Sequence, residues 1–264
     1  MPANPTWPQI GSPLSERELK RFKQRDAEYE FLRYLTTDRR HFFEDFGSPV
    51  ADGFVAATNI GHLIYTTPGA TTTGFAHVAH ADGIIRGVSG TTAATSGLKI
   101  ATPVEYYGDQ MCGMEVRYRT SVITEERIEM GFASTSPSIN TRYVNSMATP
   151  TFNTTANAAL YLYDHATATT TSGLYTIGTA ITAAKTATTT NRPVADTWQT
   201  IRIQVVTNHV YVWVDGIPLA KHNTSGTNYI EGGTAAAWVF SVVRSDTTDA
   251  NQELDYVRTW QARL

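Results

Sequence analysis

The sequence predicts a mostly β protein, a two-sheet antiparallel β-sandwich preceded by an N-terminal extended arm and an α-helical segment. Three observations lead to this fold class. Residues 198–219 alternate apolar and polar side chains with the two-residue period of strands that bury one face. Many further short segments of this kind lie between clusters of Gly, Pro, Asn and Thr. No helical pattern alternates with them, which favours a sandwich or barrel over the α/β classes.

The extended arm is expected over residues 1–13. A helix is excluded there by four prolines, Pro2, Pro5, Pro8 and Pro13. Trp7 and Ile10 are the apolar points of this arm. An exposed Trp gains nothing on a free tail, so one interpretation is an arm that docks on another subunit. The alternative is an ordinary loose terminus.

Residues 14–49 are expected to form a helical segment for anchoring or oligomerisation. Ser15 and Glu18 fit a capping box, Ser12-Pro13 is an alternative start, and Gly47-Ser48-Pro49 ends the element. An apolar stripe runs along it, made of Leu19, Phe22, Ala27, Phe31, Leu35, Phe42, Phe43 and Phe46. The stripe either packs on the β-domain of its own chain or contacts another protein. We expect the second role, because the β-region after residue 50 is complete without it.

Residues 50–264 are expected to form the sandwich. The predicted strands are Gly53–Ala57, Ile60–Tyr65, Phe75–Ala79, Ile84–Val88, Leu98–Thr102, Cys112–Val122, Ile128–Ala133, Ala158–Tyr163, Leu174–Ile177, Trp198–Val206, Val210–Val214, Trp238–Arg244 and Leu254–Gln261. The Thr/Ala-rich stretch 164–192 is expected to be strand or extended loop, because apolar residues interrupt it. Asp215-Gly216 fits a tight turn, as does Thr207-Asn208, and Pro218 favours an edge or strand-start position.

Composition excludes several classes of function. The 264 residues carry a net charge of −3, which gives no electrostatic footprint for nucleic acid. No apolar run is long enough to span a bilayer, and the N-terminus lacks the pattern of a signal peptide. The single cysteine, Cys112, excludes a disulfide framework and a multi-cysteine zinc site. Because Cys112 alternates with Met114 and Val116, we expect it to be a buried packing residue.

Three segments of the chain stand out together: Trp198-Gln-Thr-Ile-Arg-Ile, Val210-Tyr-Val-Trp-Val-Asp-Gly and the closing Leu254-Asp-Tyr-Val-Arg-Thr-Trp-Gln. They resemble the concanavalin A-like lectin/glucanase sandwich, which legume-type lectins, laminin-G-like modules and family 16 glycoside hydrolases share. The resemblance covers residues 50–264. It implies a jelly-roll of one convex and one concave antiparallel sheet, with ligands usually on the concave face. It says little about function, because this sandwich hosts many activities.

The hydrolase branch of this resemblance implies two catalytic carboxylates and an assisting Asp at Glu-x-Asp-x-(x)-Glu spacing. The candidate segment is Glu125-Glu126-Arg127-Ile128-Glu129, where Arg127 stands in place of the assisting Asp. An Arg between two carboxylates lowers their pKa values, whereas the acid role needs a raised pKa. We therefore expect a solvated ion-pair row and no enzyme. His77 and His80, near Asp82, should point to opposite faces of a strand, so we expect no metal site.

The lectin branch has candidate residues. Tyr211 and Trp213 share a strand face opposite a row of valines, and Tyr161 and Tyr163 lie opposite leucines. Aromatic rings stack on sugars, so these four residues are candidates for glycan binding on a solvent-accessible face. The alternative is that their rings fill the second face of each sheet against a loop or the N-terminal helix.

Together these features predict a non-enzymatic structural protein of a bacteriophage virion, a capsid-decoration, head-fibre or tail-associated protein. Its low-charge, Thr/Ala/Gly-rich β-surface is similar to such proteins. Residues 1–46 are expected to bind capsid or tail proteins through Trp7, Ile10, Leu19, Phe22, Phe31 and Leu35. The sandwich would be displayed on the virion surface after assembly in the host cytoplasm, as a homo-oligomer and, by analogy, a trimer. The alternatives are a lectin module for host-surface glycans and, less favoured, a family 16 hydrolase. No cofactor, metal, nucleic-acid or membrane partner is expected.

Overall fold

The chain divides into two compact units, Met1–Arg39 and Arg40–Leu264, and the strands belong to the second apart from the first residue of β1. The computed structural model describes residues 39–44, 59–60, 63–66, 73–78, 83–88, 97–103, 105–108, 111–124, 126–134, 144–146, 151–152, 157–164, 171–178, 181–188, 192–206, 209–223, 236–243 and 250–262. These residues include no helix with the length and apolarity that a membrane span requires.

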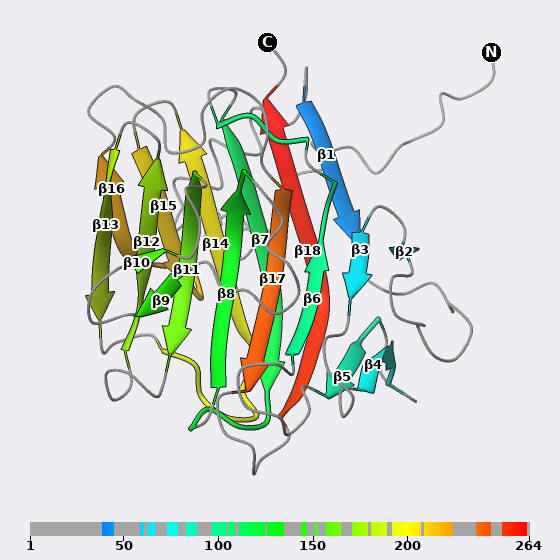
Figure 1. The fold of residues 1–264 in the computed structure, drawn as a ribbon. Coiled ribbons are helices and arrows are strands. Elements are labelled where there is room, and N and C mark those ends of the chain that lie inside the picture. The colour runs from blue at the N-terminus through cyan, green and yellow to red at the C-terminus, as the bar shows by residue number, and fades with distance from the viewer. Residues whose placement is uncertain are drawn as a thin grey trace, which may run out of the picture. The chain divides into compact units, whose positions relative to one another are not determined.

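Sheet A has eight strands. Seven follow the order β16-β15-β14-β7-β18-β5-β4, and β1 also pairs with β18. Their bounds are β1 Arg39–Glu44, β4 Thr73–His77, β5 Ile85–Val88, β7 Cys112–Thr120, β14 Gln199–Val206, β15 His209–Val214, β16 Ile217–Asn223 and β18 Asn251–Ala262. The closing strand β18 is antiparallel to β7 along most of its length and to β5 at its start, so it binds two parts of the sheet together (Figure 1).

Sheet B also has eight strands, in the order β13-β12-β11-β8-β17-β6-β3-β2. Their bounds are β2 Asn59–Ile60, β3 Leu63–Thr66, β6 Gly97–Ala101, β8 Glu126–Ala133, β11 Ala158–Asp164, β12 Thr171–Gly178, β13 Ile181–Thr188 and β17 Ala236–Val243. A separate short pair is formed by β9, Val144–Ser146, and β10, Thr151–Phe152. Figure 1 shows the two large sheets one behind the other, which confirms the predicted two-sheet antiparallel architecture.

Two predicted elements are wrong in part. The helical segment expected over residues 14–49 includes Arg39–Glu44, which is strand β1 and belongs to sheet A. The sequence around Phe42 and Phe43 is compatible with a strand as well as with a helix. In the structure this segment is a strand because it pairs with β18. The single strand expected over Ile60–Tyr65 is instead the hairpin β2–β3, because Asn59 pairs with Ile64 and Ile60 with Leu63. The remainder of residues 1–49 and the predicted strand Gly53–Ala57 lie outside the described residues.

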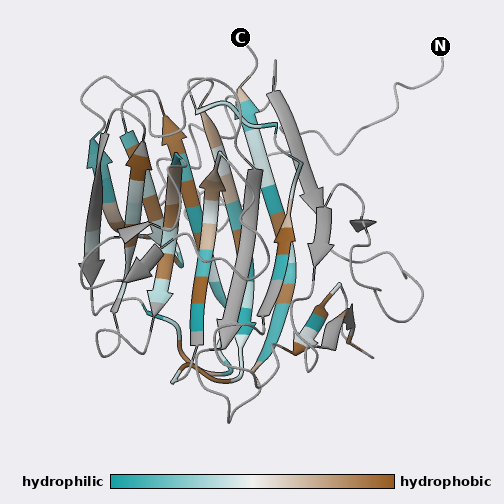
Figure 2. Cartoon of the chain, viewed as in Figure 1, coloured by the Kyte–Doolittle hydropathy of each residue, from teal (hydrophilic) through white to brown (hydrophobic). Residues whose placement is uncertain are grey.

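The hydrophobic core lies between the inner faces of the sheets. Sheet A contributes Met114 and Val116 from β7 and Ile201 and Ile203 from β14, and all four are at most 2% exposed. Sheet B contributes Ile128, Met130 and Phe132 from β8 to the same cluster. Figure 2 shows apolar and polar residues alternating along the strands, as one buried face per strand requires. Cys112 is fully buried in this core, which confirms its predicted packing role.

The β15–β16 hairpin matches its prediction. Asp215 and Gly216 both have positive φ, 51° and 76°, as a tight turn of this kind requires. The Asp215 carboxylate accepts a bond from the Thr200 amide at 2.8 Å, and the Asp215 amide donates to the Thr200 carbonyl at 2.8 Å. Pro218 then lies in β16, which is the edge strand of sheet A, as predicted.

His222 joins the two sheets at this edge. It lies in β16, yet its ring nitrogens contact Thr176 Oγ1 of β12 at 2.7 Å and Thr186 Oγ1 of β13 at 2.8 Å. The side chain is only 7% exposed, and burial lowers the pKa of His222 to about 4. The imidazole is therefore neutral in the folded protein at ordinary pH, with a threonine hydroxyl at each nitrogen.

This arrangement predicts that acid weakens the fold. An unfolded chain takes up a proton on His222 near pH 6.5, whereas the folded chain takes it up only near pH 4. The free energy of unfolding should therefore fall as the pH is lowered through this window, by up to about 3 kcal/mol from this residue. Urea unfolding of wild type and His222→Gln at pH 7 and pH 4.5 measures the difference. Equal pH slopes for the two proteins would contradict the assignment.

Candidate functional site

Apolar side chains dominate the inner faces, so a ligand could meet polar side chains mainly on the outer faces of the sheets. On sheet B, the side chains that strand alternation places on the outer face include six large ones that are at most 7% exposed: Lys99, Arg127, Glu129, Leu160, Leu162 and Tyr175. At these residues the outer face of sheet B is closed to solvent.

A buried ion pair occupies the centre of this face. Arg127 Nε donates to Glu129 Oε1 at 3.0 Å, Nη2 lies 3.0 Å from the same oxygen, and both side chains are 0% exposed. The predicted ion pair is present, but the expectation that it is solvated is wrong, because Leu160 and Leu162 of the neighbouring strand share its face. Glu125, the second candidate carboxylate, lies outside the described residues.

Lys99 adds a third buried charge to the outer face of sheet B. Lys99 and Glu129 face the same residue of β17, Phe240, from opposite sides. Burial lowers the pKa of Lys99 to about 8. Burying a charged group costs free energy unless it interacts with an opposite charge. We therefore interpret the ionic groups on this face as structural.

Glu129→Gln should therefore destabilise the protein, by about 3 kcal/mol, because it leaves the Arg127 charge buried beside a neutral group. The double variant Arg127→Met with Glu129→Leu should recover much of this loss, since it removes both charges together. Asp196→Asn, at an exposed position, is the matched control and should change stability by less than about 0.5 kcal/mol. Chemical denaturation measures all three. A Glu129→Gln protein as stable as wild type would contradict the buried pair.

Tyr161 and Tyr163 lie in the hydrophobic core. Both are 0% exposed and belong to the cluster between the sheets, so the prediction that they present a solvent-accessible face is wrong. The Tyr163 hydroxyl donates to the Ile123 carbonyl at 2.9 Å, and burial raises the pKa of Tyr161. The outer positions of β11 are taken by Leu160 and Leu162 instead.

Tyr211 and Trp213 do lie on the outer face of sheet A, and both are half-buried. They form a column with His209 along β15: the His209 and Tyr211 rings are 5.7 Å apart, and the Tyr211 and Trp213 rings 5.5 Å apart, with planes inclined by 28° and 21°. Tyr211 therefore has an aromatic neighbour on each side along the strand. This column is the part of the predicted glycan-binding set that the structure leaves at the surface.

Cations from neighbouring strands flank the column. Lys221 Nζ lies 5.4 Å from the centre of the Tyr211 ring, and Arg202 Cζ lies 5.2 Å from that of Trp213. Arg202 also lies 5.4 Å from the ring of Trp260, which covers Gly113 so closely that a Cβ there would be 2.1 Å from the ring. These cation–π contacts tie β14, β15, β16 and β18 together across the outer face.

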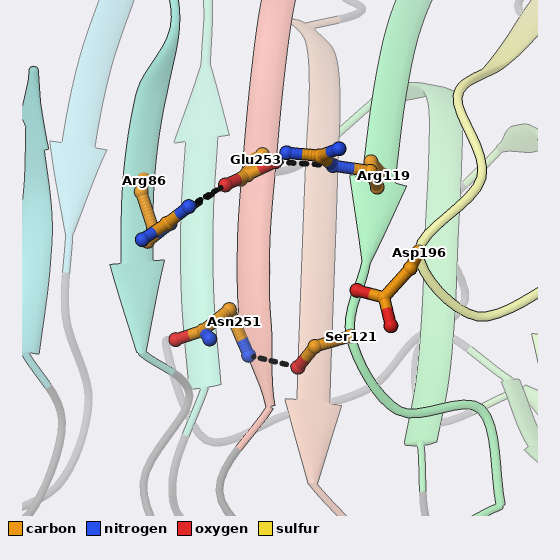
Figure 3. Close-up of a pocket in the computed structure, with 6 residues that line it drawn as sticks. All are labelled: Arg86, Arg119, Ser121, Asp196, Asn251 and Glu253. Atoms are coloured by element: carbon orange, nitrogen blue, oxygen red, sulfur yellow. Dashed lines mark hydrogen bonds and ion pairs between the residues drawn. The ribbon is translucent and has the colours of Figure 1, made fainter. Parts of the chain in front are cut away.

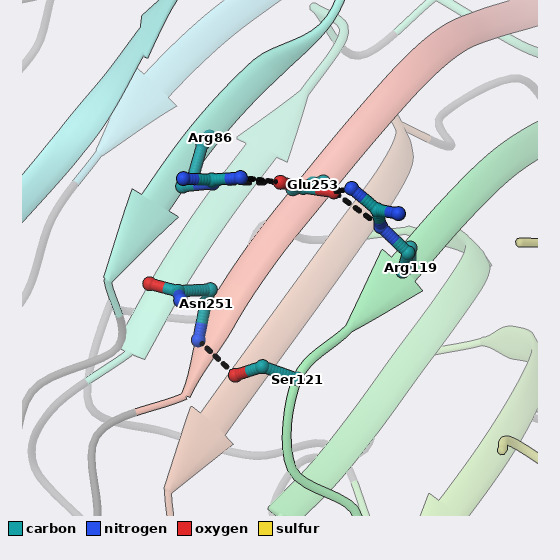
Figure 4. A network of polar contacts seen from close by, with 5 residues as sticks. All are labelled: Arg86, Arg119, Ser121, Asn251 and Glu253. Carbon is teal, nitrogen blue, oxygen red and sulfur yellow. Dashed lines mark hydrogen bonds and ion pairs between the residues drawn. The ribbon is translucent and has the colours of Figure 1, made fainter. Parts of the chain in front are cut away.

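A second polar cluster lies farther along the outer face of sheet A. Glu253 of β18 accepts bonds from Arg86 of β5, at 2.6 Å from Nε, and from Arg119 of β7 (Figure 4). Arg117 pairs with Asp255, and the ring of Trp198 lies 5.0 Å from Arg117 and 4.8 Å from Arg119. The sequence analysis did not predict this cluster. The features of the sequence that pointed to it were the alternating Arg117 and Arg119 and the acidic residues of the closing strand.

The other predicted site residues are not placed by the structure. Trp7, Ile10, Leu19, Phe22, Phe31 and Leu35 all lie outside the described residues, as do His80 and Asp82. Within the part of the chain that the structure describes, no three His, Cys, Asp or Glu side chains come close enough to hold a metal ion.

Comparison with known proteins identifies the fold. No protein-family model matches the chain, and no curated protein matches it by sequence. A protein of unknown function from Shewanella oneidensis MR-1 is 12% identical, with a TM-score of 0.54 over 89% of this chain and 93% of that one. Bacillus licheniformis β-glucanase is 11% identical, with a TM-score of 0.54 over 86% and 100%. The carbohydrate recognition domain of Emp47p is 11% identical, with a TM-score of 0.56 over 86% and 99%.

At such identities the likeness shows the fold alone. The chain has the concanavalin A-like lectin/glucanase fold, which confirms that part of the expected resemblance. Proteins with this fold include both hydrolases and lectins, so the fold leaves the choice between catalysis and binding to the site residues.

Proposed function

We propose that this chain is a non-enzymatic structural and display protein, anchored through its N-terminal segment and carrying a lectin-like sandwich outward, as in a bacteriophage virion. The observation that carries the non-enzymatic part is the buried Arg127–Glu129 pair. Retaining or inverting glycoside hydrolysis needs two carboxyl groups on either side of a bound sugar. Glu129 is 0% exposed and held by a guanidinium, so it is poorly suited to act as either one.

The outer face of sheet A supports the display role. Its aromatic, cationic and acidic side chains are engaged with one another across several strands, from Lys221 on β16 to Arg86 on β5. Such cross-strand contacts stiffen a sheet without demanding a ligand. A rigid sandwich of low charge suits repeated display on a particle, and the Pro-rich arm and Phe-containing segment before it suit attachment.

A lectin module for host-surface glycans is the second candidate. The half-buried column of His209, Tyr211 and Trp213 favours it, because aromatic side chains beside polar groups recur in sugar sites. Tyr211 already has a ring on each side, however, so a sugar would meet ring edges and the Lys221 ammonium more readily than an open aromatic face. The two roles are compatible, because many displayed copies convert weak binding into avidity.

The anchoring role predicts that Phe22→Asp with Phe31→Asp abolishes self-association or docking and leaves the sandwich folded. Light scattering after size exclusion measures the mass, and circular dichroism reports on the sheets. Point substitutions are preferable to a truncation at Val50, because such a truncation removes β1 from sheet A.

The matched control is Val194→Asp with Ile217→Asp, which adds the same two charges at exposed apolar positions of the sandwich. This control should assemble as wild type does. A wild-type chain that is monomeric and fails to bind particles, or a Phe22/Phe31 variant that assembles normally, would contradict the anchoring role.

A further inference from the structure

A hollow of about 300 Å³ opens on the outer face of sheet A, away from the aromatic column. It is lined by Arg86, Arg119, Ser121, Asp196, Asn251 and Glu253 (Figure 3). Every lining residue is polar or charged, although the strands beneath it carry the apolar core. The volume is at the lower end of the range for small-molecule sites, large enough for one sugar-sized ligand.

At one wall of this hollow, a negative charge lies beneath two positive charges. The Glu253 side chain is 4% exposed, whereas those of Arg86 and Arg119 are 43% and 30% exposed. The carboxylate therefore lies underneath, and the two guanidinium groups lie outermost. Each arginine uses Nε and Nη2 on Glu253, so the Nη1 donors of both have no partner among the described residues. An anion approaching this wall meets two oriented cations that are already fixed in place.

The opposite wall offers groups that bind hydroxyls. Asp196 is held rigidly, with a positive φ of 56° and its amide donating to the Thr120 carbonyl at 2.8 Å. Its carboxylate and the side-chain amide of Asn251 have no partner among the described residues. Ser121 Oγ accepts a bond from the Asn251 backbone amide at 2.9 Å, and this pair lies across from the row of Arg86, Glu253 and Arg119 (Figures 3 and 4).

We propose that this hollow binds a sugar acid, a monosaccharide unit that carries one carboxylate and adjacent hydroxyl groups. The ligand carboxylate lies against the Nη1 groups of Arg86 and Arg119. The ligand hydroxyls donate to Asp196 and bond to the Asn251 amide. A neutral sugar offers no charge to the Nη1 donors that Glu253 leaves unused, and a simple inorganic anion makes no use of Asp196, which would repel it. The mixed lining therefore fits an acidic polyol better than either.

The location also separates this site from the aromatic column. The hollow is built on β5, β7 and β18 and the loop before β14, whereas the column lies on β15. The proposal is therefore independent of virion attachment and of any role for Tyr211 and Trp213, and each can fail without the other.

The test is a titration of the full-length chain, by calorimetry and by ligand-observed NMR, with the methyl glycosides of glucuronic acid, galacturonic acid and N-acetylneuraminic acid. Methyl glucoside is the neutral comparison. At least one acid should bind with a Kd below about 10 mM, and at least about tenfold more tightly than methyl glucoside. Arg86→Gln should weaken that binding by about tenfold, since a charge-assisted bond is lost while Arg119 still holds Glu253.

Arg117→Gln is the matched control, because it makes the same change on the same face at a side chain that is 42% exposed, pairs with Asp255 and does not line the hollow. It should leave binding of the acid unchanged. Asp196→Asn, at an exposed position that Asn tolerates with positive φ, should weaken binding several-fold without altering the melting temperature. Failure of all three acids to bind, equal binding of methyl glucoside, or equal losses in Arg86→Gln and Arg117→Gln would each overturn the proposal.

Discussion

The packing of the two inner sheet faces against each other decides where this protein can carry chemistry. At Gly131 on β8, a Cβ would lie 2.2 Å from the Ala159 carbonyl oxygen and 2.9 Å from Ile203 Cδ1 on the other sheet. With φ at 144°, this position favours glycine on conformational grounds as well. Such close contact leaves no internal cavity for a ligand at this point of the described core. A ligand is therefore expected to bind on an outer face.

The two outer faces differ in kind. On sheet B, aliphatic side chains and the Arg127–Glu129 pair share a surface that is closed to solvent at the described residues. On sheet A, arginines, acids and aromatic rings lie at or near the surface and contact one another across strands. This contrast is the basis for the proposed display or binding role, and it makes sheet A the face on which a ligand could meet polar side chains.

The sequence was sufficient for the fold because buried apolar residues recur at every second position over Ile201–Val205 and Val210–Val214. It is not sufficient where both faces are apolar: the run Ala158–Tyr163 alternates alanine or leucine with tyrosine, and this pattern does not say that the tyrosines face the core. The burial of Arg127 could not be predicted from the sequence either, because it depends on the residues that pack around the outer face of sheet B. Arg86, Arg119 and Glu253 come from three strands distant in sequence, and only the sheet order brings them together.

The most direct test is carbodiimide labelling of carboxylates in the native full-length chain, read residue by residue by mass spectrometry. The reagent modifies only carboxyl groups that it can reach. Asp196 should be modified in the native protein, whereas Glu129 should be protected until the protein is unfolded. Rapid labelling of Glu129 in the native state would contradict the account, because the outer face of sheet B would then be open and a catalytic carboxylate could act there.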